Sequence, residues 1–186
     1  DLQSMENLQA VDAQGQPVGR TILGLVKVAV PTQPVQPDHV VVANLDNRVR
    51  LLGYSLDEGA LRPGATVPIT LYWQVMGALP HDYSVFIHLV DKDRDMAGQG
   101  DGPPMEGYYP TSFWERGETL TDPHSLVIED TAMPGTHYLQ IGLYDLETGQ
   151  RLALLDGSGA PIGDTIDLGT VQVQPPLATG PTDDCD

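Results

Sequence analysis

The feature that most constrains the fold of this chain is a repeat that links its two ends. Residues 1–22 read DLQSMENLQAVDAQGQPVGRTI, and residues 145–166 read DLETGQRLALLDGSGAPIGDTI. At constant spacing, Asp1, Leu2, Leu8, Asp12, Gly15, Pro17, Gly19, Thr21 and Ile22 match Asp145, Leu146, Leu152, Asp156, Gly159, Pro161, Gly163, Thr165 and Ile166. After one extra residue, Asp167, the match resumes with LGLVKV (23–28) against LGTVQV (168–173). Turn composition alone would not reproduce the flanking apolar residues, so the two segments are predicted to be copies of one structural unit.

The repeat predicts how the chain is organised. We expect residues 1–30 to be the terminal strands of a preceding repeat, or a donor-strand segment, and residues 39–173 to be one full β-sandwich domain. A fixed period is the mark of an array. Between them, the Pro-rich residues 31–38 are expected to be an extended, stiff linker. Residues 174–186, QPPLATGPTDDCD, are expected to be a flexible tail.

Short apolar runs between turn residues fill the predicted domain. Residues 61–75 and 82–91 alternate between apolar and polar positions, residues 136–145 alternate again, and residues 118–130 read as an interrupted strand. The first run alternates through Val67, Ile69, Leu71, Trp73 and Val75, and the second through Tyr83, Val85, Ile87 and Leu89. The third has Tyr138, Gln140, Gly142 and Tyr144 on one face and His137, Leu139, Ile141 and Leu143 on the other. This pattern predicts an all-β fold, an antiparallel β-sandwich of immunoglobulin-like or jelly-roll-like type.

The charge of the chain disfavours some partners. Asp and Glu number 26 against 9 Lys and Arg, which gives a net charge of −17. Such a surface repels phosphate backbones, so we expect no nucleic-acid binding. The single cysteine, Cys185, excludes an internal disulfide. No stretch reaches the ~18 consecutive apolar residues that mark a membrane helix.

Several runs, taken in order, resemble a known family. LLGYSLD, LRPGATVPITLYWQV, YSVFIHLVDKD, DGPP, YPTSFWERGE and PGTHYLQIGLYDLETGQRL lie within residues 51–152. They resemble a β-sandwich domain at the C-terminal, extracytoplasmic end of bacterial multi-pass membrane proteins, many of them dolichyl-phosphate-mannose-type glycosyltransferases. The resemblance covers roughly residues 45–173. It implies an extracellular or cell-surface location and a weak link to surface glycan, and it brings no catalytic motif.

A calcium site is one candidate for function. The run DKDRDMAGQGDG (91–102) carries Asp91, Asp93, Asp95 and Asp101. Ca²⁺ takes six to eight oxygen ligands, often from carboxylates close in sequence. The run lacks the glycine and glutamate of an EF-hand loop. The alternative is a hairpin turn that Asp and Gly stabilise.

A glycan site is a second candidate. Tyr108, Tyr109 and Trp114 lie together in GYYPTSFWERGE. Flat aromatic faces flanked by polar groups can stack on sugar rings. The alternative is a long loop folded over the end of the sandwich, with Trp114 filling the core. Trp73, in the middle of an alternating run, is predicted to be a core residue.

No enzyme motif supports a catalytic role. The five histidines are scattered, and the sequence holds no G-x-S-x-G, no H-E-x-x-H and no glycine-rich phosphate loop. Acidic residues are so abundant that a carboxylate pair carries no weight as evidence of a glycosidase. We therefore expect a protein that is not an enzyme and needs no cofactor, unless calcium binds.

The first thirty residues predict assembly. Residues 22–30, ILGLVKVAV, would expose a strand edge if they stayed unpaired. The predicted assembly residues are Ile22, Leu23, Leu25, Val26 and Val28. They would complete a preceding copy in a longer protein, or pair in trans with the sheet of a neighbour, itself or a homologous domain, by strand addition. A head-to-tail contact of that kind builds filaments unless it closes into a ring.

These observations predict a non-catalytic extracellular structural or interaction module. It would be a repeat of a surface array, or a head-to-tail filament subunit that assembles through its N-terminal strands. The alternative is a carbohydrate-binding accessory domain of a membrane glycosyltransferase-like protein, with surface glycan as its ligand.

Overall fold

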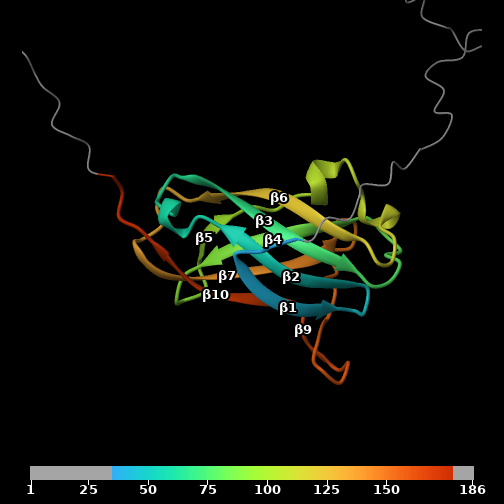
Figure 1. Ribbon diagram of the computed structural model, residues 1–186. Helices are drawn as coiled ribbons and strands as arrows, with labels where there is room; N and C mark the ends of the chain where they lie inside the picture. The colour runs from blue at the N-terminus through green and yellow to red at the C-terminus, as the bar shows by residue number, and fades with distance from the viewer. Residues whose placement is uncertain (1–34, 178–186) are drawn as a thin grey trace, which may run out of the picture. The chain divides into compact units, whose positions relative to one another are not determined.

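The computed structural model describes residues 35–177, which fold into antiparallel β-structure (Figure 1). The described part contains no α-helix, only the short 3₁₀ segments η1 (Glu58–Ala60), η2 (Pro104–Gly107) and η3 (Thr111–Phe113). The strands are β1 (His39–Leu45), β2 (Val49–Leu56), β3 (Thr66–Val75), β4 (Tyr83–Val90), β5 (Met96–Gln99), β6 (Thr119–Ile128), β7 (Gly135–Asp145), β8 (Leu154–Leu155), β9 (Pro161–Gly163) and β10 (Ile166–Val173). The prediction of an all-β antiparallel fold is confirmed.

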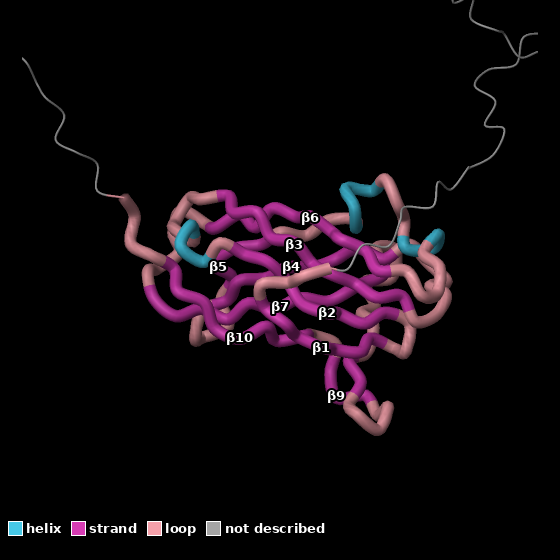
Figure 2. Tube along the Cα trace, in the orientation of Figure 1, coloured by secondary structure: helices cyan, strands magenta, loops and turns pink. Residues whose placement is uncertain are grey.

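The ten strands form one curled sheet with β5 as the link between two halves. Their order is β10-β7-β4-β5-β6-β3-β2-β1-β8-β9. The link is short, because β5 pairs with β4 at His88–Val90 and with β6 only at Val127 and Ile128. The sheet curls at this link, so that β4 and β7 lie across from β2 and β3 (Figure 2).

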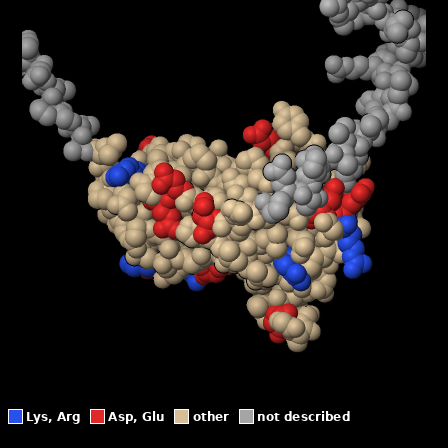
Figure 3. All heavy atoms as spheres, viewed as in Figure 1, with Lys and Arg blue, Asp and Glu red and all other residues tan. Residues whose placement is uncertain are grey.

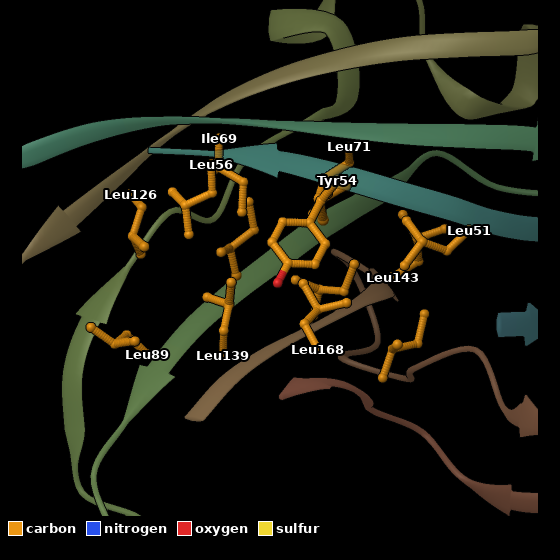
Figure 4. Packing of buried hydrophobic residues seen from close by; sticks show 14 of the residues in the cluster. Leu51, Tyr54, Leu56, Ile69, Leu71, Leu89, Leu126, Leu139, Leu143 and Leu168 are labelled. Carbon is orange, nitrogen blue, oxygen red and sulfur yellow. The ribbon is translucent and has the colours of Figure 1, made fainter. Parts of the chain in front are cut away.

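The core lies between the two halves, as the alternation predicts. Figure 4 shows side chains from β2, β3 and β6 facing side chains from β4, β7 and β10. The alternating apolar positions of β3 and β4 are all buried, and in β7 the buried face is the one with His137, Leu139, Ile141 and Leu143. Fully burying a Leu or Ile side chain contributes about 1.5–3 kcal/mol each. The core includes Leu51, Tyr54, Ile69, Leu71, Trp73, Ile87, Leu89, Leu126, Leu139, Ile141 and Leu143.

One strand differs from the prediction. Residues 118–130 were expected to form an interrupted strand because Pro123 lacks an N–H, yet β6 runs without a break. Pro123 faces Thr70 of β3, while the pairing of β6 with β5 is confined to Val127 and Ile128. At Pro123, β6 therefore pairs with a strand on one side only. The N–H that proline lacks would point to the unpaired side, so no hydrogen bond between strands is lost.

Strand β10 lies at one end of the sheet. Its only strand partner in the described part is β7, from Ile166 opposite Ile141 to Val173 opposite Gly135. The chain beyond β10 is still attached to the domain, because the Gln174 N–H donates to the Leu61 carbonyl at 2.7 Å. The repeated sequence 145–173 thus supplies both ends of the sheet: β10 pairs with β7 at one end, and β8 and β9 continue from β1 at the other.

Candidate functional site

The segment that the repeat singles out, residues 145–173, is called the closing segment below. It opens with a turn that Asp145 organises. The Asp145 Oδ1 accepts hydrogen bonds from the backbone N–H of Glu147 (2.8 Å) and of Thr148 (3.1 Å). The Thr148 amide, more than any other group, holds the pKa of the Asp145 carboxyl below its ordinary value. Asp145 is therefore an anchor of the turn after β7.

A second aspartate organises the turn between β8 and β9. The Asp156 Oδ1 accepts from the N–H of Ser158 (2.8 Å) and of Ala160 (2.9 Å). The Ser158 hydroxyl also donates to it, and is the largest cause of the lowered pKa of Asp156. Gly159 follows at φ +87°, a left-handed conformation that suits glycine.

The strand of the closing segment, β10, covers the core. Ile166, Leu168, Val171 and Val173 are buried, and the residues between them are exposed. The register of β10 against β7 shifts between Asp167 and Gly169, which marks a β-bulge. Gly169 has φ +101°, and its N–H donates to the Asp167 Oδ1 at 2.9 Å.

Several of the identities shared by the two repeats are residues that shape the fold, although others, such as Leu146, are exposed. Asp1 and Asp12 match the turn anchors Asp145 and Asp156, and Gly15 and Gly24 match the left-handed Gly159 and Gly169. The one-residue difference between the repeats falls at Asp167, in the bulge of β10. A bulge is a place where a strand accommodates one extra residue. The repeat is therefore a repeat of structural determinants and not only of composition.

The predicted assembly residues lie outside the described residues, but their matches are described. Ile22, Leu23, Val26 and Val28 match four buried positions of β10, namely Ile166, Leu168, Val171 and Val173. Leu25 matches Thr170, which is exposed. The match therefore separates four predicted inward positions from one outward position, which sequence reasoning had grouped together.

The structure does not bring the predicted calcium ligands together. Asp91 lies in the turn between β4 and β5, and its Oδ1 accepts from the N–H of Asp93 (2.8 Å) and of Asp95 (2.9 Å). The Asp95 amide, above all, lowers the pKa of Asp91. The Asp93 carboxylate pairs with Lys92. In residues 35–177, no group of three acidic, His or Cys side chains has the arrangement of a metal site.

The fourth predicted ligand, Asp101, belongs to a different contact. Its Oδ1 accepts from the Ile87 N–H at 3.0 Å, and its carboxylate lies 3.4 Å from the His88 Nε2. Asp101 therefore binds to β4 and takes no part in the turn of Asp91. The acidic run acts as a hairpin turn, which is the alternative that the sequence left open.

The predicted glycan residues are divided by the structure. They lie in a loop, residues 103–118, called the end loop below. Tyr108 is 87% exposed, whereas Trp114 is 3% exposed and belongs to the core cluster. Tyr109 is partly buried, and its hydroxyl donates to the Phe113 carbonyl at 2.8 Å. The three rings do not form one exposed face, and Trp114 fills the core.

Sequence reasoning missed a buried polar network beneath the end loop. Asp122 and Trp73 are both fully buried, and the Trp73 Nε1–H donates to the Asp122 Oδ2 at 2.9 Å. The Met105 N–H donates to the other oxygen at 2.7 Å, and the His124 Nε2 lies 2.9 Å from Asp122. The signal was present, because Asp122 and His124 occupy the same alternating positions of β6 as Leu126.

The face of the molecule in Figure 3 shows Lys and Arg as separate spots and not as a continuous stripe. Among the described residues, no helix has the length and apolar character needed to cross a membrane. No family model matches the sequence. No curated protein matches it either.

Proposed function

We propose that this chain is a non-catalytic structural module of an extracellular or cell-surface array, with residues 1–28 serving as the closing segment of a preceding copy. The fold we propose for each copy is a β-sandwich of immunoglobulin-like or jelly-roll-like type, in which the two halves of the curled sheet are the two layers. The partner of the module is another copy of itself or a homologous domain.

The observation that carries the proposal is the agreement between the repeat and the structure. Residues 1–28 retain the turn-forming aspartates, the left-handed glycines and the apolar residues at the buried positions of β10. These features all serve to close a sheet of this kind. A strand with such a buried face needs a core to cover, and the domain of residues 39–173 already has its own closing segment.

The occupied edge of β7 favours an array over a filament of identical chains. In this chain, β10 pairs with β7 along its whole length. A strand from another identical chain that took the place of β10 on β7 would have to displace β10, and with it the buried residues Ile166, Leu168, Val171 and Val173. Completing a preceding copy requires no such exchange. We therefore favour tandem copies joined by the linker at residues 31–38.

A structural role also fits the use of the acidic side chains. Asp91, Asp145 and Asp156 each accept backbone amides within a turn, and Asp122 holds the end loop. These carboxylates support the fold through hydrogen bonds. The acidic surface suits a soluble module outside the cell.

The experiment is an exchange of the two repeats. In a chimera, residues 145–173 of the chain are replaced by residues 1–28. If residues 1–28 are a closing segment, the chimera folds cooperatively and the amides of the introduced strand are protected from hydrogen exchange. An unfolded chimera, or one whose introduced strand lacks protection, contradicts the proposal.

A matched pair of variants makes the exchange specific. Within the chimera, Val26→Asp places a carboxylate at the position of the buried Val171, and Leu25→Asp places one at the position of the exposed Thr170. We expect the first variant to unfold the chimera and the second to leave its melting temperature nearly unchanged. Equal effects would show that the introduced strand does not adopt the register of β10.

A further inference from the structure

The outer face of the sheet carries an aromatic platform that the core does not require. Val85 and Ile87 point into the core, so Phe86 lies on the outer face of β4, yet it is only 2% exposed. Gly142 of β7 leaves room for the ring, because a Cβ there would lie 2.4 Å from the Phe86 Cε1. The Arg151 guanidinium covers the ring, with Cζ 4.1 Å from the centroid.

Two more rings extend this platform. The centroid of Phe86 lies 5.0 Å from that of His88 and 6.5 Å from that of Tyr144. With Asp101 and Gly149, these residues line a depression of about 290 Å³. Its lining combines aromatic area with a carboxylate, an imidazole and a guanidinium, which is the mixture found in sites that orient a polar ligand.

A second depression shares Asp101 with the first. It has a volume of about 430 Å³, and Pro68, Pro123 and Ser125 line it from β3 and β6. Glu106 of η2 also belongs to its lining. Because Asp101 lines both depressions, we call the two together the outer groove. The lining of the outer groove includes Phe86, His88, Asp101, Glu106, Ser125, Tyr144 and Arg151.

Polar groups of the outer groove are available to a ligand. Within residues 35–177, the Tyr144 hydroxyl, the Ser125 hydroxyl and the Glu106 carboxylate have no hydrogen-bond partner. The Asp101 side chain is 33% exposed. Together these groups offer both donors and acceptors around the two depressions.

The placement of Glu106 is enforced by the fold. Met105 and Glu106 have φ values of 53° and 54°, the left-handed region that non-glycine residues rarely adopt. Such a conformation persists where surrounding contacts impose it. Here the Met105 N–H is held by the buried Asp122 carboxylate at 2.7 Å. The buried network therefore fixes the loop that brings Glu106 to the outer groove.

From these observations we propose that the outer groove binds a short neutral saccharide. The Tyr144 ring would pack against the C–H face of a sugar ring, beside the Arg151 guanidinium that Phe86 supports from below. Asp101 and Glu106 would accept hydrogen bonds from sugar hydroxyls, and Tyr144 and Ser125 would complete the contacts. Asp101 lines both depressions, so a saccharide of two units that contacts Asp101 would place one unit in each.

Electrostatics select a neutral sugar over an acidic one. The groove contains the carboxylates of Asp101 and Glu106 against one guanidinium, which is engaged by Asp164 at 3.4 Å. The whole chain carries a net charge of −17. A sulfated or uronic-acid sugar would be repelled, whereas hydroxyl groups can donate to both carboxylates. This site differs from the aromatic residues of the end loop that the sequence suggested.

The experiment starts from an array of neutral and acidic oligosaccharides probed with the labelled full chain. The strongest neutral oligosaccharide is then titrated by calorimetry against the parent chain and two variants. Tyr144→Ala removes the ring and hydroxyl, and Glu106→Gln removes a charge while keeping the shape. We expect each variant to weaken binding at least about tenfold, since each loses a direct contact.

Tyr108→Ala is the matched control, because Tyr108 is an exposed aromatic of the end loop that does not line the groove. It should bind like the parent chain. Melting curves establish that all variants remain folded. The proposal is overturned if the folded parent binds no neutral oligosaccharide, if both groove variants bind like the parent, or if only Tyr108→Ala loses binding. The test is independent of the chimera, which reports only on the closing segment.

Discussion

The turns of the closing segment and the end loop are held in opposite ways. The turns of the closing segment are organised by Asp145 and Asp156, each of which binds amides within four residues of itself. The end loop depends on distant residues, because Met105 binds Asp122 and the Ser112 N–H donates to Asp82. The strands of the closing segment do have remote partners, since β10 pairs with β7 and Ala153 exchanges hydrogen bonds with Asp46. Its turns, however, carry their determinants within their own sequence, whereas the end loop depends on residues elsewhere in the chain.

The sharpest test of this contrast is a charge placed on either face of β10. Val171→Asp buries a carboxylate at a position that is 2% exposed. We expect a loss of about 4 kcal/mol in the free energy of unfolding. Thr170→Asp, on the exposed face, should change it by less than about 0.5 kcal/mol. Urea titration measures both, and similar losses in the two variants would mean that β10 is not the amphipathic strand described above.

The end loop should respond to the loss of its remote anchor. Asp122→Ala leaves the Trp73 indole N–H and the Met105 amide without their acceptor in a buried site. Because each unsatisfied buried group costs about 1–3 kcal/mol, we expect a loss of about 3 kcal/mol. Hydrogen exchange should show the Met105 amide becoming unprotected while the amides of β10 stay protected relative to global unfolding. The exposed Asp130→Ala serves as the control.

The bulge in the closing segment offers a smaller effect. Gly169 adopts φ +101°, so Gly169→Ala should cost about 1–2 kcal/mol through backbone strain alone, since nothing lies near the added carbon. Gly163 is exposed, has open space around it and is not among the residues with positive φ. Gly163→Ala is therefore expected to be close to neutral. Thermal unfolding of the two variants side by side compares them, and a reversed order would contradict the assigned backbone conformation.

Acid should weaken the turns of the closing segment. The pKa values of Asp145 and Asp156 are lowered in the folded chain, first by the Thr148 amide and the Ser158 hydroxyl respectively. Their stabilisation is therefore present above about pH 4, the ordinary range for Asp, and is lost as the pH falls below it. In chemical denaturation from pH 6 downward, Asp145→Asn and Asp156→Asn should each show a shallower loss of stability than the parent chain. An unchanged slope in both would exclude these carboxyls as a source of acid sensitivity.

Features that depend on neighbouring residues could be predicted from the sequence, whereas features that depend on distant contacts could not. The alternating positions of β3 and β4, the two faces of β7, the core position of Trp73 and the all-β class could be predicted, because alternation along a strand is a local property. The calcium prediction grouped Asp101 with Asp91, Asp93 and Asp95 because all four are close in sequence. In the structure Asp91 organises one turn, whereas Asp101 is bound to β4. The glycan prediction grouped Tyr108 with Trp114, which have opposite exposures. Proximity in sequence does not say which way a loop residue points.

The sequence by itself determined that residues 1–28 and 145–173 share one sequence pattern, because the aspartates, glycines and apolar residues of that pattern recur at matching positions along the chain. Only the tertiary structure decided that this unit is the terminal strand on β7, that Asp122 is a buried anchor, and that Phe86, Asp101 and Glu106 share an outer groove. Those residues come from β4, the segment after β5, β6 and η2. Asp101 lies beside Phe86 because the chain after β5 stays hydrogen-bonded to β4, where Val85 and Gly102 exchange two hydrogen bonds. Contacts of this kind between separate segments leave no periodic pattern in the sequence.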